Sequence, residues 1–369
     1  MSKLFNDLLD EIERGLKGEN GVIPLQLGRL SEYLEISKGT MYTIGAETSG
    51  GKTSFALDQF MIYPLRWYME NKDKMNVKLN VIYFCMERSQ VMNTAKLISK
   101  LAFERDGQHI SAKKIMGRHK DKLTESQVNY IKRWQEYVDE MISNLKIYEG
   151  VQTAESITKI LEEYAANNGR EIIVKDDDGE DITVYLPRHP NHITLILVDH
   201  IGLISKTKES IDAFSKIMRI SKDYWKFSPV VIQQFNREIA DSKRGGAKNR
   251  PKLSDFEGAA STQQDSEVVV ALYNPYTHLT KEEIRSENPV EDIVGYDLMK
   301  LRNEYGIPMY RSIHLLKNTY GGAGLYTGLA FQPMTGTFKE IPRPDEITDW
   351  DYDQITSESI FTDFKTQLL

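Results

Sequence analysis

The stretch TIGAETSGGKTSFALDQ, residues 43–59, holds a glycine-rich loop that ends in Gly-Lys-Thr at 51–53. Phosphate-binding loops contain a glycine, four further residues and then Gly-Lys-Ser/Thr. The first glycine of that pattern is expected at position 46, but the chain has Ala46 there and Gly45 one residue earlier. A small alanine with a glycine beside it can still make the turn, so we interpret the stretch as a phosphate loop. The alternative is a glycine turn that happens to precede a helix.

The second half of this loop carries the chemistry of phosphate binding. Backbone N–H groups of residues 48–53 can surround an anion at the start of a helix, where the helix dipole adds partial positive charge. Lys52 brings a cation to the β- and γ-phosphates, and the Thr53 hydroxyl is a ligand for Mg²⁺. The expected cofactors are therefore ATP and Mg²⁺. The expected ATP-binding residues of the loop are Ala46, Glu47, Thr48, Ser49, Gly50, Gly51, Lys52, Thr53 and Ser54.

Short apolar segments, several of them continuous and rich in β-branched residues, alternate with helical stretches along the chain. They are residues 41–45, 80–87, 192–200, 228–236, 266–273 and 311–318. Such segments are typical of strands that are buried on both faces of a mostly parallel sheet flanked by helices. The predicted fold class is therefore α/β, and ligands are expected at the carboxyl ends of the strands. The polar residues at those ends are Glu87, Asp199, Gln234 and Lys317.

Two of these residues are acids with the expected properties of metal-binding or catalytic groups. Asp199 follows the apolar residues LILV, and an acid in that position beside a phosphate loop can hold Mg²⁺ through water. Glu87 ends the strand after the loop helix, where a carboxylate can polarise the attacking water. For Glu87 the alternative is an ordinary solvated strand end. We expect Thr53 and Asp199 at the metal and Glu87 as the general base.

The composition is that of a soluble globular protein. Of the 369 residues, 40% are hydrophobic and 27% are charged, and no apolar run approaches the roughly 18 residues that span a bilayer. The N-terminus has no signal-peptide hydrophobic region, so we expect a cytoplasmic protein, in the host cytoplasm if it is phage-encoded. The single cysteine, Cys85, excludes an internal disulfide and a cysteine-based zinc site. The net charge of −7 argues against general coating of nucleic acid but allows a local basic loop.

Three parts are expected along the chain. Residues 1–20 form a linker and docking helix, in which apolar residues recur at helical spacing between acids. This helix either packs on its own domain or docks on a neighbouring subunit. Residues 21–340 form the ATPase domain, with a helical insertion at about 100–190 that contains an Asp-Gly hairpin at 170–186. The acidic residues 341–369 are expected to form a flexible tail that can bind a partner.

The order of the motifs resembles the RecA-like ATPase domain of DnaB-type replicative helicases, over about residues 22–335. Members of that family often have alanine where this chain has Ala46. VIYFCMER and LILVDHIGLI resemble the segments that carry the catalytic glutamate and the Mg²⁺-linked aspartate. VVIQQFNRE resembles the strand that ends in a phosphate-sensing glutamine, and LSDFEGAASTQQDSEVVVALY resembles the stretch that runs from a loop into a strand. The resemblance implies a RecA-like P-loop NTPase with four catalytic residues: Lys52, Glu87, Asp199 and Gln234.

Two features depart from the family pattern. The family usually has Lys-x-Arg after the penultimate strand, and its arginine reaches the γ-phosphate of the adjacent subunit. Here the segment reads Lys317-Asn318-Thr319, so the ATP-contacting lysine is kept and the arginine is lost. We expect either that Arg302 or Arg311 substitutes, or that activation by the neighbour is weaker. Bacterial members have an N-terminal domain where this sequence has a short helix, so we expect a compact phage-like version of the family.

Ring-shaped motors of this family place two loops of each subunit in a central channel, and two basic segments are candidates. They are SKTKES at 205–210 and REIADSKRGGAKNRPK at 237–252. Lysine and arginine in such loops grip phosphates without regard to sequence, and no aromatic residue is interleaved for base stacking. The alternative is an ordinary solvated loop. The expected DNA-binding residues are Lys206, Lys208, Arg237, Lys243, Arg244, Lys248 and Arg250.

The resemblance implies an ATP-dependent, ring-forming replicative DNA helicase that translocates on single-stranded DNA. Its implied partners are single-stranded DNA, further copies of the chain in a hexamer, and a primase or helicase loader, with no membrane. A RecA-type recombinase or recombination mediator shares the core and is the first alternative, although the segment 228–273 favours the helicase. The second alternative is an ATP-binding assembly switch with low turnover, which the missing arginine at Thr319 favours.

Overall fold

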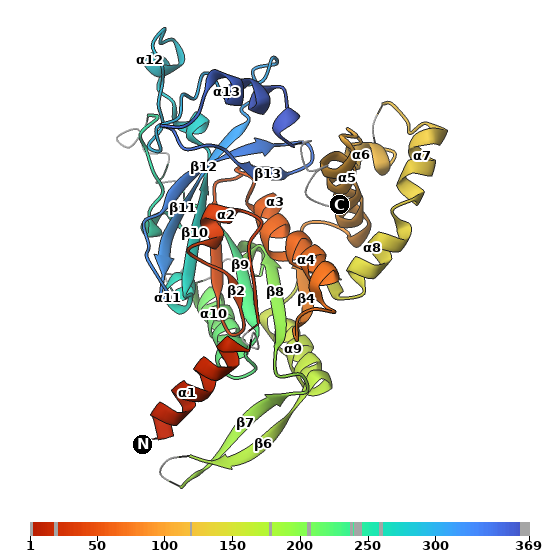
Figure 1. Cartoon of the computed structure of the whole chain (residues 1–369), viewed down its shortest axis with the longest axis vertical. Helices are drawn as coiled ribbons and strands as arrows, with labels where there is room; N and C mark the ends of the chain where they lie inside the picture. The colour runs from red at the N-terminus through yellow and green to blue at the C-terminus, as the bar shows by residue number, and fades with distance from the viewer. Residues whose placement is uncertain are drawn as a thin grey trace.

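The computed structural model describes residues 3–17, 21–118, 120–176, 179–204, 208–236, 239, 246–257 and 261–361. A nine-stranded sheet crosses the middle of the molecule, and helices lie on both of its faces (Figure 1). The strands follow one another in the order β13-β12-β11-β10-β3-β9-β8-β4-β5. Their bounds are β3 (Tyr42–Ala46), β4 (Lys78–Cys85), β5 (Leu145–Glu149), β8 (His192–Asp199), β9 (Ser228–Gln234), β10 (Val268–Tyr273), β11 (Tyr310–Asn318), β12 (Tyr326–Gln332) and β13 (Thr337–Glu340).

The sheet is mostly parallel, which confirms the predicted α/β class. Parallel pairs join six neighbouring strands of the sheet, in the order β10, β3, β9, β8, β4 and β5. On the other side of β10, the strands β11, β12 and β13 are added in antiparallel pairs. All the segments predicted as strands are strands. The sequence did not predict β5, β12 and β13. β5 lies at one edge and is only half-buried, so it has no continuous apolar run.

Two cores fill the two faces of the sheet. Along β4, Tyr83 and Cys85 join one core, while Ile82 and Phe84 join the other, because successive side chains of a strand point to opposite faces. The first core lies under α3 (Lys52–Leu57), the π-helical turn η1 (Asp58–Ile62), α4 (Tyr63–Asn71), α5 (Gln90–Asp106) and α8 (Gln135–Ile142). The second lies under α9 (Ala154–Asn168) and α10 (Lys208–Asp223).

Smaller elements complete the described chain. The short strands β1 (Val22–Ile23) and β2 (Ile36–Ser37) pair with each other. The remaining short helices are α2 (Gly28–Ser31), α6 (Ala112–Ile115), α7 (Glu125–Lys132), α11 (Ser261–Asp265) and α12 (Lys281–Ile284). Among the described residues, no helix is both long enough and apolar enough to cross a membrane.

The predicted insertion at about 100–190 has a strand of the main sheet in its middle. The predicted hairpin is present: β6 (Gly169–Lys175) and β7 (Asp181–Pro187) pair antiparallel and extend beyond the body of the molecule (Figure 1). Between the helices of this region, however, β5 pairs with β4 in the central sheet. The region is therefore partly core, because one of its strands belongs to the central sheet.

The acidic C-terminal segment differs from the flexible tail that was expected. Its described part, which ends at Phe361, contains α13 (Asp349–Thr356). Ile355 and Phe361 are fully buried in a core with Tyr296 and Tyr310. The prediction failed because the acidic composition of the segment concealed two apolar anchors. Residues 362–369 lie outside the described part.

The N-terminal helix α1 (Lys3–Leu16) leaves its apolar face uncovered. The exposed side chains on this face are Phe5, Leu8, Leu9, Ile12 and Leu16. The helix contacts the body through Arg14, whose Nη2 donates to Oδ1 of Asn191 at 3.3 Å. Figure 1 shows α1 extending away from the sheet at the end where the hairpin lies. An uncovered apolar face does not fit the interpretation in which the helix packs on its own domain.

Candidate active site

β3 brings the glycine-rich loop to the carboxyl edge of the parallel strands. Gly51, the residue before α3, has φ +101°, a conformation that costs little for glycine because it has no Cβ. The N–H of Gly50 donates to the carbonyl of Glu47 at 3.0 Å and closes the turn. The first N–H groups of a helix have no acceptor within the helix, so this end of α3 can bind an anion.

The positions of Gly45 and Ala46 explain the extra residue in the motif. Both belong to β3 rather than to the turn, and Ala46 is the fully buried last residue of the strand. A Cβ on Gly45 would lie 2.3 Å from the ring of Phe256 and 2.6 Å from that of Phe235. Gly45 is therefore required by packing of the sheet, and the turn begins after Ala46.

A buried ion network fixes the helix that follows the loop. Lys100 Nζ on α5 lies 2.9 Å from Asp58 on η1 and 2.6 Å from Glu104, which also pairs with Arg66 on α4 at 3.0 Å. Burial raises the pKa of Asp58 to about 6, and the neighbouring Lys100 acts against this rise. The π-helical turn precedes Pro64, which cannot donate the usual helical bond.

Thr53 and Asp199 are adjacent, as their expected role at one metal requires. Thr53 Oγ1 donates to Asp199 Oδ1 at 3.1 Å, and the hydroxyl of Tyr83 donates to Oδ2 at 3.2 Å. Burial raises the pKa of Asp199, while Arg88 favours its charged form. A hydroxyl and a carboxylate are hard oxygen ligands that suit Mg²⁺. Among the described residues no cluster of three His, Cys, Asp or Glu could hold a metal, so phosphate and water oxygens would complete the shell.

Glu87 lies beyond the end of β4 and has a partner that the sequence did not predict. His200 Nε2 lies 3.2 Å from Glu87 Oε1, and the carboxylate remains more than one-third exposed. His200 directly follows Asp199, the last residue of β8, and Glu87 lies just beyond the end of the neighbouring strand β4. The imidazole therefore holds the proposed base at the same edge of the sheet as the metal ligands.

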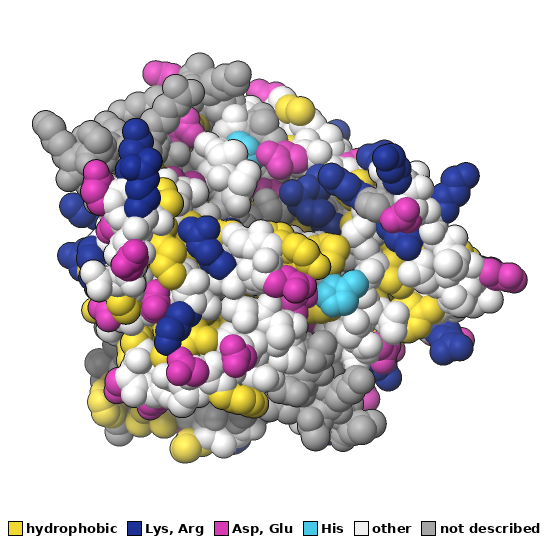
Figure 2. All heavy atoms as spheres, turned by 90° about the horizontal axis from the view of Figure 1, so that it is seen from above, with side chains coloured by type: hydrophobic (Ala, Val, Ile, Leu, Met, Phe, Trp, Pro, Cys, Tyr) yellow, Lys and Arg dark blue, Asp and Glu magenta, His cyan; other side chains and the backbone are white. Residues whose placement is uncertain are grey.

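The candidate residues surround one cavity of about 390 Å³ beside the loop. Its walls include most of residues 48–54, together with Glu87 and Gln234. Gln234 Nε2 donates to Thr48 Oγ1 at 2.6 Å and thereby links the end of β9 to the loop. Figure 2 views the molecule from this end, and Lys and Arg side chains are visible beside a hollow near the middle of the face. Arg88, His200 and Arg311 also line the cavity, although the sequence reasoning did not assign them to it.

The Glu47 side chain does not line this cavity, although the residue was predicted to bind ATP. Its carboxylate accepts a hydrogen bond from Thr277 Oγ1 at 3.0 Å and pairs with His278 Nε2 at 3.0 Å. These contacts tie the loop to the segment after β10. Glu47 is therefore suited to supporting the loop, and only its backbone is left for the phosphates.

Lys317 lies at the opposite edge of the sheet from the loop. Because β11 is antiparallel to β10, its end is aligned with the beginnings of the parallel strands: Val269 pairs with Lys317 on one side and with Thr43 on the other. Lys317 Nζ donates to the carbonyls of Gln263 and Gln264 at 3.0 Å each. Lys317 does not line the cavity of its own chain, and its assignment as an ATP-binding residue remains a prediction.

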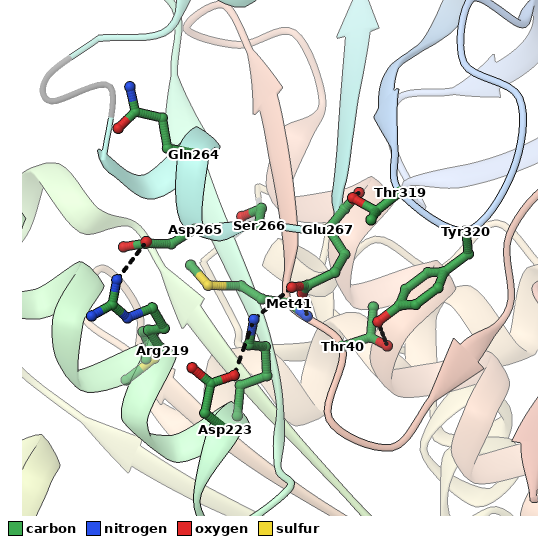
Figure 3. A network of polar contacts seen from close by, with 12 residues as sticks. Thr40, Met41, Arg219, Asp223, Gln264, Asp265, Ser266, Glu267, Thr319 and Tyr320 are labelled. Carbon is green, nitrogen blue, oxygen red and sulfur yellow. Dashed lines mark hydrogen bonds and ion pairs between the residues drawn. The ribbon is translucent and has the colours of Figure 1, made fainter. Parts of the chain in front are cut away.

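Thr319, at the position of the family arginine, is held in a polar network at that same edge (Figure 3). Its Oγ1 donates to the carbonyl of Glu267 at 3.1 Å, and Glu267 pairs with Lys222 at 2.5 Å. The next residue, Tyr320, is largely exposed, and its hydroxyl accepts from Thr40 Oγ1 at 3.3 Å. Residues 319 and 320 thus offer hydroxyl groups but no positive charge.

Neither arginine that was predicted to substitute lies near Thr319. Arg311 belongs to the cavity of its own chain: its Nε donates to the Gly50 carbonyl at 3.1 Å, and its guanidinium lies 4.6 Å from the ring centre of Phe331. Burial lowers the pKa of Arg311 to about 10. Arg302 stacks on Tyr276 near the start of β11. Neither arginine takes the place of the family arginine beside Thr319, and whether Arg302 or Arg311 substitutes for it in another way remains a prediction.

The predicted DNA-binding residues lie mostly outside the described part of the chain. Lys206, Arg237, Lys243 and Arg244 fall there, as does the side chain of Lys208 at the start of α10. Lys248 Nζ lies 3.4 Å from Glu291 and donates to the carbonyl of Asp292 at 2.9 Å. Arg250 is exposed and lies in the same segment. Their assignment to DNA remains a prediction.

Comparisons with known proteins agree with this geometry. The model of the DnaB-like helicase C-terminal domain matches residues 139–339, more than half of the chain. That range contains Asp199 and Gln234, while Lys52 and Glu87 precede it. No curated protein matches the chain. A solved structure described as a DnaB-like replicative helicase and its interactions with primase matches with a TM-score of 0.59 and 16% identity, over 90% of this chain and 68% of that one. The chain belongs to the DnaB-like helicase C-terminal domain family.

Proposed function

We propose that the protein hydrolyses Mg²⁺-ATP between the subunits of a ring and uses it to move along single-stranded DNA as a helicase. The observation that carries this proposal is the convergence of the catalytic candidates on one cavity at the carboxyl edge of the sheet. Lys52, Thr53, Glu87 and Gln234 line the cavity, and the fully buried Asp199 is bonded to Thr53. Membership of a helicase family supports the same activity.

Each residue of the proposed ATPase site has a role that follows from its chemistry. Bound Mg²⁺ supplies positive charge to the β- and γ-phosphates. The loop N–H groups and Lys52 would bind these phosphates, and Thr53 and Asp199 would hold the metal. Glu87, oriented by His200, would position the attacking water and accept its proton. Gln234 is bonded to the loop through Thr48 and precedes the basic segment 237–252, so it can pass a change at the γ-phosphate to that segment.

Two measurements test this function against its alternatives. Imaging of the protein with ATP and single-stranded DNA should show closed rings, whereas filaments would support a recombinase. Steady-state ATP turnover should rise when single-stranded DNA is added. Turnover near background in both conditions would support an assembly switch. The proposed partners are single-stranded DNA, six copies of the chain in the ring, and a primase or loader; the similar solved structure is described with primase.

Deletion of residues 1–17 should impair ring assembly more than folding. The apolar face of α1 is uncovered in the chain, which is the arrangement expected of a helix that docks on a neighbouring subunit. Leu8→Ser with Ile12→Ser should act like the deletion, whereas Glu13→Gln on the same helix should not. Sedimentation with ATP measures the oligomer, and a melting curve checks the fold. An unchanged oligomer in the deletion would contradict docking by α1.

A variant that neutralises four basic residues of the segment should bind all single-stranded sequences more weakly, and about equally so. The four residues are Lys243, Arg244, Lys248 and Arg250. The neutralisation should also flatten the dependence of log affinity on log salt, since each phosphate contact contributes about 0.7 to that slope. ATP turnover without DNA should change little, and DNA-stimulated turnover should fall. Salt titrations with a labelled oligonucleotide make the measurement.

The matched control for this variant neutralises four lysines of residues 113–122, on and after α6, away from the cavity. This control should keep the parental slope. Equal slopes for the parent and the 243–250 variant would show that the segment is not the DNA contact, and Lys206 and Lys208 would be tested next.

A further inference from the structure

Position 319, where the family has an arginine, carries no positive charge in this chain. Thr319 occupies the place of that arginine and donates to a backbone carbonyl. Lys317 is held by two carbonyls at the same edge. Charge that develops on a transferring γ-phosphate requires a positive group close to it. Another side chain of this protein must then supply the positive charge at the γ-phosphate.

Arg302 and Arg311 were the arginines expected to substitute, and their positions differ. Arg311 lines the cavity, but its Nε donates to Gly50 and its Nη1 to the carbonyl of Tyr310. These bonds hold the glycine-rich loop to β11. Arg302 is stacked on an aromatic ring outside the cavity. Two nitrogens of Arg311 are thus committed to holding the loop, and Arg302 does not line the cavity.

Arg88 combines a place in the cavity wall with a buried donor that has no partner among the described residues. It directly follows the proposed base Glu87 and lines the cavity with Lys52 and Gln234. Its Nη1 is buried, and no residue of the described chain bonds to it. A buried guanidinium nitrogen without a partner is costly and commonly marks a place that a ligand fills.

We propose that Arg88 contacts the γ-phosphate of the ATP bound to its own chain and supplies, in cis, the positive charge that Thr319 cannot supply in trans. The proposal rests on the proposed ATPase function. The fork of an arginine can bind two phosphate oxygens at once, which a lysine cannot do.

The first test separates catalysis from nucleotide binding. Arg88→Ala should lower kcat by about 10²-fold or more, the typical effect of removing one donor from developing negative charge. Affinity for ADP should stay within a few-fold, while binding of ADP with aluminium fluoride, which mimics the transferring phosphate, should fall with kcat. Arg88→Lys should recover part of the loss. Arg118→Ala, which removes an exposed arginine outside the cavity, is the matched control and should behave as the parent.

The second test distinguishes action in cis from action in trans. Arg88→Ala and Glu87→Gln subunits, carrying different tags, are co-purified as mixed oligomers. If Arg88 serves its own chain, every site lacks either the base or the arginine, and turnover stays at the level of the separate variants. Recovered turnover in the mixture would overturn the proposal, because it would mean that Arg88 acts on the neighbouring site.

The controls separate failure of this inference from failure of the proposed function. Inactive Lys52→Ala and Glu87→Gln, together with a fully active Arg88→Ala, would refute the role of Arg88 alone. Full turnover in all three variants would refute the ATPase site itself.

Discussion

Lys52→Ala should abolish ATP turnover and weaken binding of ATP. Lys52 is the only cation within residues 46–54, and it stands at the first turn of α3 on the wall of the cavity. Its removal leaves the backbone N–H groups to face the β- and γ-phosphates without the mobile charge that phosphoryl transfer uses. Phosphate release measured over time gives the turnover, and titration with a fluorescent ATP analogue gives the affinity.

The control for this variant is Lys113→Ala, which removes an exposed lysine on α6. It should retain the parental turnover and affinity. A Lys52→Ala protein that is folded and hydrolyses ATP at the parental rate would remove the basis for assigning residues 46–54 to phosphate binding.

Glu87→Gln should bind ATP with nearly the parental affinity and lose hydrolysis by about 10²–10⁴-fold, the usual contribution of a general base. The amide keeps the shape of the side chain and can still bond to His200, which lies 3.2 Å from the carboxylate. It cannot accept the proton of the attacking water. Single-turnover hydrolysis and equilibrium binding, measured on the same preparation, separate the two effects.

Glu125→Gln, on α7 and exposed, is the control and should be indistinguishable from the parent. If Glu87→Gln stayed within about twofold of the parental rate, the effect would be far below that of a general base. The base would then have to be sought elsewhere, first at Asp199.

The sequence predicted the parts of the fold that depend on burial. Strands such as β8, buried along its whole length, are continuous apolar runs and can be recognised without a structure. The edge strand β5 could not be recognised in this way because solvent reaches it and its side chains are mixed. Phe361 and Ile355 were overlooked because two apolar side chains in an acidic segment leave almost no periodic signal.

The sequence could identify those candidate site residues that belong to one local motif. The loop around Lys52 is such a motif, and so are the single acids at the ends of β4 and β8. The direction of β11 is set by its pairing with distant strands, so the sequence could not show that Lys317 lies at the far edge. The proposed roles of Arg88 and His200 could have been suspected from the sequence, because each directly follows a motif acid, but the argument for them comes from their position in the cavity.

Strand separation on a labelled forked duplex is the measurement that tests the central claim most directly. Forks with a 5′ or a 3′ single-stranded tail should be compared, with the parent and Glu87→Gln, in the presence and absence of Mg²⁺-ATP. We expect the parent to open one of the two forks only when Mg²⁺-ATP is present, and Glu87→Gln to bind the tail and leave the duplex intact. DNA-stimulated ATP hydrolysis by the parent with both forks left closed would contradict the account of this protein as a helicase.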